Sequence, residues 1–161
     1  MTKSFFASGL IAGFITGILD IAAACLRLYL INKATPEQVL RGIAAGAFGK
    51  EAAASGNMMI LWGLLFHFVI AISFAFLFFF LAKQIPALVK YPIPTGILYG
   101  IFVWAFVRYV ILNYISTIHI KAFTGKESFI NNAIIPAAII VICIGIPLAF
   151  LARSWITKNK G

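Results

Sequence analysis

The chain has 161 residues, of which 63% are hydrophobic and 11% are charged, with a formal net charge of +9. Soluble domains are about half apolar and a quarter charged. This composition, with a mean hydropathy of +1.04, therefore excludes an ordinary soluble enzyme domain and a disordered chain. The 13 basic residues stand singly, mostly at the ends of apolar runs, which is typical of membrane anchoring and not of nucleic-acid binding. We expect one transmembrane domain over residues 1–161, with the lipid bilayer as its partner and no nucleic acid.

Four apolar runs are each long enough to cross a bilayer. They cover residues 5–26, 58–82, 93–115 and 133–152. Separate runs of this length can satisfy their backbone groups in lipid only as helices, so we expect an all-α, integral membrane four-helix bundle. With four spans both termini lie on one side of the membrane. A slight excess of basic residues on that side predicts that it faces the cytoplasm.

A short amphipathic helix is predicted between the first two spans, over residues 36–48. Thr35 is the expected N-cap, Pro36 takes the first helical position, and Gln38 stands three residues after the cap, which is a capping box. Apolar residues then recur at three- and four-residue spacing. The segment is too short to span, so we expect it to lie at the membrane interface or to enter it shallowly. A solvated surface helix is the alternative.

Three ionisable residues interrupt the spans, namely Asp20, His67 and Arg108. Each such group costs ~2.5–3.5 kcal/mol on insertion scales. Each lies fifteen residues from the inner end of its span, which corresponds to ~22 Å along a helix. The sequence therefore predicts an intramembrane polar cluster at one level of the bundle.

Glycines at four-residue spacing lead toward each of these residues. Small side chains let neighbouring helices approach closely, so we expect these rows to turn the ionisable residues toward other helices and away from lipid. The predicted helix-packing glycines are Gly9, Gly13 and Gly17 in the first span, Gly63 in the second, and Gly96 and Gly100 in the third.

Three interpretations of the polar cluster stay open. In the first, Asp20 and Arg108 form an ion pair that staples the first and third helices, with His67 alongside. In the second, Asp20 and His67 exchange protons or hold a small solute on a pathway through the bundle. In the third, a lipid headgroup binds under the amphipathic helix, with Arg27, Arg41 and Arg108 as its basic partners.

Other chemistry lacks candidates in this sequence. There is no nucleophile–base–orienter set for an enzyme, and one intramembrane histidine is too few for the usual pair of haem ligands. Asp20 has no second acid nearby for a metal ion. Cys25 and Cys143 both fall inside apolar runs, where we expect small buried side chains. The sequence therefore predicts no enzyme, no cofactor and no metal.

Three stretches of the chain carry a resemblance to a known family. They are Gly9-Leu10-Ile11-Ala12-Gly13 with Leu19-Asp20, the segment from Thr35-Pro36 to Glu51-Ala52, and the segment from Gly63 through His67 to Gly100. In these stretches the chain resembles the YagU-type family of small bacterial inner-membrane proteins. The resemblance implies a multi-pass protein of the bacterial inner (cytoplasmic) membrane, and it adds no substrate.

Two roles are consistent with these features. The chain moves protons or a small solute, or supports the envelope under stress, through Asp20, His67 and Arg108. Alternatively, it is a structural or accessory subunit that packs on a larger membrane complex through its glycine faces. Four helices of this size enclose little space, so we expect a transport role to need a homo-oligomer.

Overall fold

The computed structural model describes residues 4–117 and 125–159, and every regular element in these ranges is a helix. Four long helices are each apolar and long enough to cross a membrane. The first two are α1 (Phe5–Asn32) and α4 (Met58–Gln84). The third joins α6 (Pro92–Phe106) to the π-helical η1 (Val107–Ile115). The fourth is one continuous run of α7 (Gly125–Phe129), η2 (Ile130–Ile134), α8 (Ile135–Ile140), η3 (Val141–Gly145) and α9 (Ile146–Asn159).

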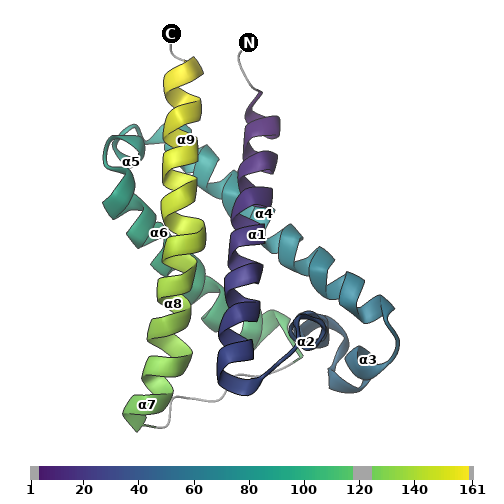
Figure 1. The fold of residues 1–161 in the computed structure, drawn as a ribbon. Coiled ribbons are helices and arrows are strands. Elements are labelled where there is room, and N and C mark those ends of the chain that lie inside the picture. Colours follow the sequence, from purple (N-terminus) through teal and green to yellow (C-terminus); the bar gives the residue numbers. More distant parts are fainter. Residues whose placement is uncertain (1–3, 118–124, 160–161) are drawn as a thin grey trace.

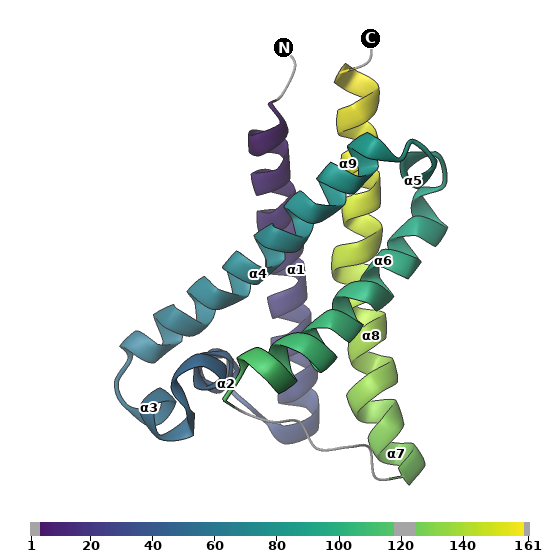
Figure 2. The same cartoon turned by 180° about the vertical axis from the view of Figure 1, so that it is seen from behind.

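Two of the long helices, α1 and the fourth helix, stand roughly upright in Figure 1, and the other two, α4 and α6, cross them. In Figure 1, α1 and the fourth helix stand side by side and run in opposite directions, and α4 and α6 cross them obliquely, as Figure 2 shows from behind. Helix α1 packs mainly along α4, whereas α6 packs mainly along the fourth helix. The start of α1 and the end of α9 lie at the same end of the molecule (Figure 1). Chain ends at one end of the molecule are expected when an even number of long helices runs back and forth.

The first and fourth helices extend beyond the predicted apolar spans. Helix α1 continues beyond residue 26 to Asn32 and ends where Lys33 adopts a left-handed φ of 56°. The fourth helix begins at Gly125, whose φ is 87°, and not at residue 133. It also continues past residue 152 to Asn159. Apolar runs mark the part of a helix that suits hydrocarbon, but a polar residue such as Arg27 does not stop helix propagation. The second and third helices begin and end within two residues of the prediction.

The short helix α2 spans Pro36–Phe48, as predicted, and it has the full capping box. The Thr35 backbone N–H donates to Gln38 Oε1 at 2.9 Å, and the Gln38 N–H donates to Thr35 Oγ1 at 3.3 Å. Helix α2 packs against the first half of α4. The contact is so close that a Cβ on Gly63 would lie 2.0 Å from the Leu40 carbonyl oxygen. The helix is therefore docked on α4, with α3 (Lys50–Ala54) completing the turn between them.

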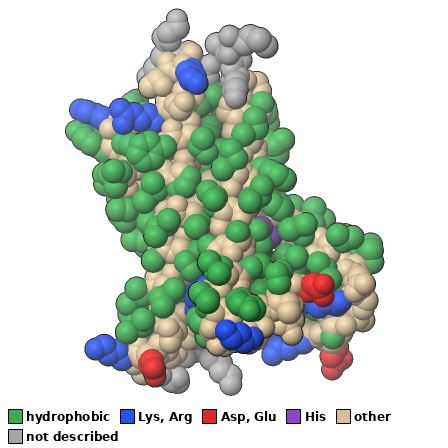
Figure 3. Space-filling model, in the orientation of Figure 1, with side chains coloured by type: hydrophobic (Ala, Val, Ile, Leu, Met, Phe, Trp, Pro, Cys, Tyr) green, Lys and Arg blue, Asp and Glu red, His purple; other side chains and the backbone are tan. Residues whose placement is uncertain are grey.

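Aromatic and small side chains fill the centre of the structure. Phe78, Phe79 and Leu148 are fully buried there, and the Tyr99 hydroxyl donates to the Phe74 carbonyl at 2.6 Å, which ties α6 to α4. Many large apolar side chains instead face outward. Figure 3 shows them along the sides of the long helices, with basic side chains toward both ends.

Candidate functional site

His67 on α4 contacts α1 one turn from Asp20, where the two helices cross. His67 Nε2 lies 2.8 Å from the Gly17 carbonyl oxygen, one turn before Asp20 on α1. A carbonyl oxygen only accepts, so Nε2 carries the hydrogen and donates it. In the neutral imidazole Nδ1 is then the nitrogen that can take up a proton. The Asp20 carboxylate interacts electrostatically with this imidazole.

Glycines bring the two helix backbones close enough for this contact. A Cβ on Gly13 would lie 2.7 Å from Ile72 Cα, and a Cβ on Gly17 would lie 2.9 Å from the Phe68 ring. A Cβ on Gly9 would meet the Phe76 ring at 2.7 Å. All three predicted packing glycines of α1 therefore pack against α4. The last of them, Gly17, also supplies the carbonyl that orients His67.

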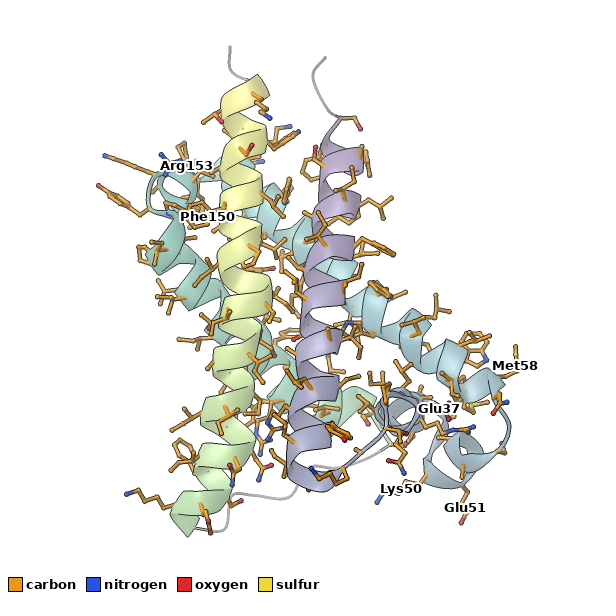
Figure 4. The ribbon with its side chains drawn as sticks, in the orientation of Figure 1. Glu37, Lys50, Glu51, Met58, Phe150 and Arg153 are labelled. Carbon is orange, nitrogen blue, oxygen red and sulfur yellow. The ribbon has the colours of Figure 1, made fainter. Side chains whose placement is uncertain are left out.

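The Asp20 carboxylate has little to hold it. The side chain is half-buried, and within residues 4–117 and 125–159 no hydrogen bond or ion pair reaches it. The charge of Asp20 also acts electrostatically on the Cys143 thiol in η3. The other described acids, Glu37, Glu51 and Glu127, are exposed, and Figure 4 shows the first two around α2 and α3. Asp20 is thus a half-buried acid on a long apolar helix, and the described basic side chain that interacts with it is His67.

Two prolines leave backbone carbonyls of the fourth helix without helical donors. Pro136 has no N–H for the Asn132 carbonyl, four residues earlier. The Ile135 N–H donates to the Ile130 carbonyl in the π-helical pattern of η2, so the Asn131 carbonyl receives neither an α- nor a π-type bond. The same pattern recurs eleven residues later, where the Ile146 N–H donates to the Val141 carbonyl and Pro147 follows.

Arg27 and Arg108 bind the carbonyls at the first of these bulges. Arg27 Nη2 donates to the Asn131 carbonyl, and Arg108 Nη1 donates to the Asn132 carbonyl at 3.4 Å. Arg27 is seven residues beyond Asp20 on α1, or about 10 Å along the axis. The structure therefore brings the three predicted cluster residues to two places. Asp20 lies with His67, whereas Arg108 lies with Arg27 and not with Asp20.

Arg41, predicted to contact a lipid headgroup, is occupied within the chain. Its Nη1 donates to the Ala53 carbonyl at 3.0 Å and to the Gly56 carbonyl at 2.8 Å, and its Nη2 donates to Asn57 Oδ1 at 3.1 Å. These bonds close the end of α3 and tie it to the start of α4. Arg41 therefore has a structural role here that the sequence did not suggest.

The remaining glycines also pack inside the chain. A Cβ on Gly96 would lie 2.7 Å from Ile146 Cα, and a Cβ on Gly100 would lie 2.6 Å from Val141 Cα. Gly63 receives α2, as described above. All six predicted packing glycines thus face a neighbouring segment of this chain, so none presents an open face to a further subunit.

The π-helical segments are the feature that sequence reasoning missed. A signal was present, because Ile-Pro occurs at residues 135–136 and again at 146–147. A proline inside a helix usually kinks it, yet in Figure 1 the fourth helix continues as one rod. Each proline comes two residues after the end of a π-helical segment. Among the described residues no group of three histidine, cysteine or acidic side chains is placed to hold a metal ion.

Comparison with protein-family models, with curated proteins and with solved structures finds no match for this chain.

Proposed function

We propose that the chain is a multi-pass protein of the bacterial inner membrane and that its four long helices form a transmembrane bundle with both termini in the cytoplasm. The outward-facing large apolar side chains support this proposal, because they would otherwise lie in water. The basic residues toward the two ends of the bundle would then lie at the headgroups (Figure 3). The resemblance to the YagU-type family points to the same membrane.

Within that bundle, the proposed activity is the movement of protons across the membrane by Asp20 and His67. The observation that carries it is the Asp20 carboxylate, which interacts electrostatically with the His67 imidazole and has no hydrogen bond or ion pair in the described part of the chain. A carboxylate that only stapled helices would be held by its partner. In the proposed step, the Asp20 carboxyl group passes its proton through an intervening water to His67 Nδ1, giving a carboxylate and an imidazolium, and the reverse transfer restores both groups. A second copy of the chain is the expected partner, since one bundle encloses little space.

The accessory-subunit alternative draws no support from the glycine rows. They were the surfaces on which a larger complex was expected to pack, and each of them is filled by a helix of the same chain. The role in the envelope under stress has no contact of its own in the structure, so we carry forward the proton pathway.

Proton flux into liposomes tests the proposal. Protein is reconstituted with an entrapped pH-sensitive dye, a potassium gradient and valinomycin, and dye response is compared with that of empty liposomes. We expect flux from the wild-type chain and its loss in Asp20→Asn. His67→Gln should also abolish flux, although its amide N–H can still donate to the Gly17 carbonyl.

The matched control is Glu37→Gln, which neutralises an exposed acid on α2 (Figure 4). It should transport like the wild type. Wild-type flux no greater than that of empty liposomes, or equal flux in Asp20→Asn, would refute the proton pathway.

A further inference from the structure

Arg27 and Arg108 converge on one spot of the fourth helix. They donate to the carbonyls of consecutive residues, Asn131 and Asn132, so the two guanidinium groups are neighbours. Both side chains are half-buried. No acid in residues 4–117 or 125–159 forms an ion pair with Arg27, and its Nε is buried without a hydrogen-bond partner in those ranges. Two like charges thus lie close together, and within those ranges no acid offsets the charge of Arg27.

Arg27 has more N–H donors than its bond to the Asn131 carbonyl uses. A guanidinium group has five N–H donors in a planar fork, which matches the oxygens of a phosphate. The bond that fixes Arg27 uses Nη2, and this leaves most of its fork for another acceptor. An anion between the two groups would also relieve their mutual repulsion.

We infer that Arg27 and Arg108 form a binding site for the phosphate of an anionic lipid headgroup. Arg27 is five residues from the end of α1 at Asn32, or about 7.5 Å along the axis, which is the depth where headgroups meet acyl chains. Exposed apolar side chains flank it on both helices, Leu26 and Leu30 on α1 and Ile134 on the fourth helix. In a ligand with a phosphate and an acyl chain, the phosphate would contact the arginines and the acyl chain would contact these apolar side chains. The inference rests on the membrane insertion proposed above and not on proton movement.

Lipid binding to the purified full chain tests the site without a bilayer. Short-chain phosphatidylglycerol, short-chain phosphatidylcholine and inorganic phosphate are titrated separately into detergent-solubilised protein, and native mass spectrometry counts the bound molecules. We expect phosphatidylglycerol to bind at least about tenfold more tightly than phosphatidylcholine, a difference of about 1.4 kcal/mol. Arg27→Gln should remove this preference. Arg153→Gln, which changes an exposed arginine on α9 at the opposite end (Figure 4), should keep it.

A second variant guards against a misfolded Arg27→Gln protein. Pro136→Ala supplies a backbone N–H near the carbonyls that the arginines now satisfy. In Pro136→Ala/Arg27→Gln the helix is therefore repaired while the charge stays absent. We expect this protein to fold and still to lack the preference, whereas Pro136→Ala alone keeps it.

Two results would overturn the lipid site. One is an unchanged preference for phosphatidylglycerol in the folded double variant. The other is binding of inorganic phosphate as tight as that of phosphatidylglycerol, which would assign the arginines to a soluble phosphate anion. The outcome of the proton-flux experiment bears on neither result, because no membrane separates compartments in the lipid-binding assay.

Discussion

The two proline bulges of the fourth helix share a pattern and differ in what surrounds them. At the first, residues 130–136, two arginines from neighbouring helices donate to the open carbonyls. At the second, residues 141–147, no described side chain donates to the Ile142 or Cys143 carbonyl, and the backbone of α6 lies directly against the helix.

This difference shows two ways to stabilise the same defect. A bulge near the end of a helix can be reached by long, charged side chains whose heads stay near water. A bulge in the middle of an apolar helix has no such donors within reach. There, glycines let a second backbone approach, and dispersion and weak Cα–H contacts replace the lost bonds.

The largest expected effect comes from breaking the packing at the second bulge. A Cβ on Gly145 would lie 2.1 Å from the Gly96 carbonyl oxygen, and backbone on both sides cannot move aside. We expect Gly145→Ala to lower the free energy of unfolding by about 3 kcal/mol or more. The measurement is denaturant unfolding in mixed micelles.

Gly42→Ala is the matched control, because a Cβ at Gly42 on α2 would meet no atom within 4 Å. It should raise stability by about 0.5–1 kcal/mol, as expected for alanine replacing glycine inside a helix. Wild-type stability in Gly145→Ala would mean that the second bulge is not held by contact between backbones.

An intermediate effect is expected from removing the donor at the first bulge. Arg27→Ala leaves the Asn131 carbonyl without its partner, which costs about 1–3 kcal/mol. Because Pro136→Ala returns a backbone donor to this turn, the cost of Arg27→Ala should be smaller in that background. A double-mutant cycle, scored by unfolding, should give a coupling of about 1 kcal/mol.

The corresponding check is Arg153→Ala, which should neither destabilise the protein measurably nor couple to Pro136→Ala, since Arg153 is exposed on α9. Additive effects of Arg27→Ala and Pro136→Ala would show that the arginine does not serve the bulge.

The smallest effect tests whether the two bulges are independent. Pro147→Ala and Arg27→Ala change separate sites, since Arg27 bonds to the Asn131 carbonyl at the first bulge and Pro147 lies at the second. Their effects on unfolding should therefore add to within about 0.5 kcal/mol. A larger coupling would mean that the two bulges are energetically linked through the fourth helix. They could then not be compared as independent sites.

The parts of the structure that follow from local sequence were predictable. Thr35, Pro36 and Gln38 define the start of α2 because a capping box needs only neighbouring residues. Glycine spacing likewise indicated which faces pack. The ends of α1 and of the fourth helix were not predictable from hydropathy, since a helix continues through Arg27 and Asn131 until a left-handed residue stops it.

The arrangement of charges depended on information that spacing does not contain. Equal distance from the span ends placed Asp20, His67 and Arg108 at one level, and His67 does contact α1 one turn from Asp20. Arg108 has a long side chain that reaches Asn132. That target becomes attractive only once the π-helical turns and Pro136 have opened a carbonyl. The direction of the Arg108 side chain thus depends on a backbone irregularity in another helix.

The bond from Arg27 to Asn131 also has a consequence for the order in which the chain assembles. Its partners are 104 residues apart in sequence, whereas α2 and α4 are neighbours in the chain and can associate while synthesis continues. Helix α1 therefore carries both Asp20 and Arg27 from the beginning, and the acceptor for the arginine arrives with the last helix. If the first helix entered lipid alone, each charge would cost ~2.5–3.5 kcal/mol. The first helix to be made thus carries an arginine whose acceptor arrives only with the last helix.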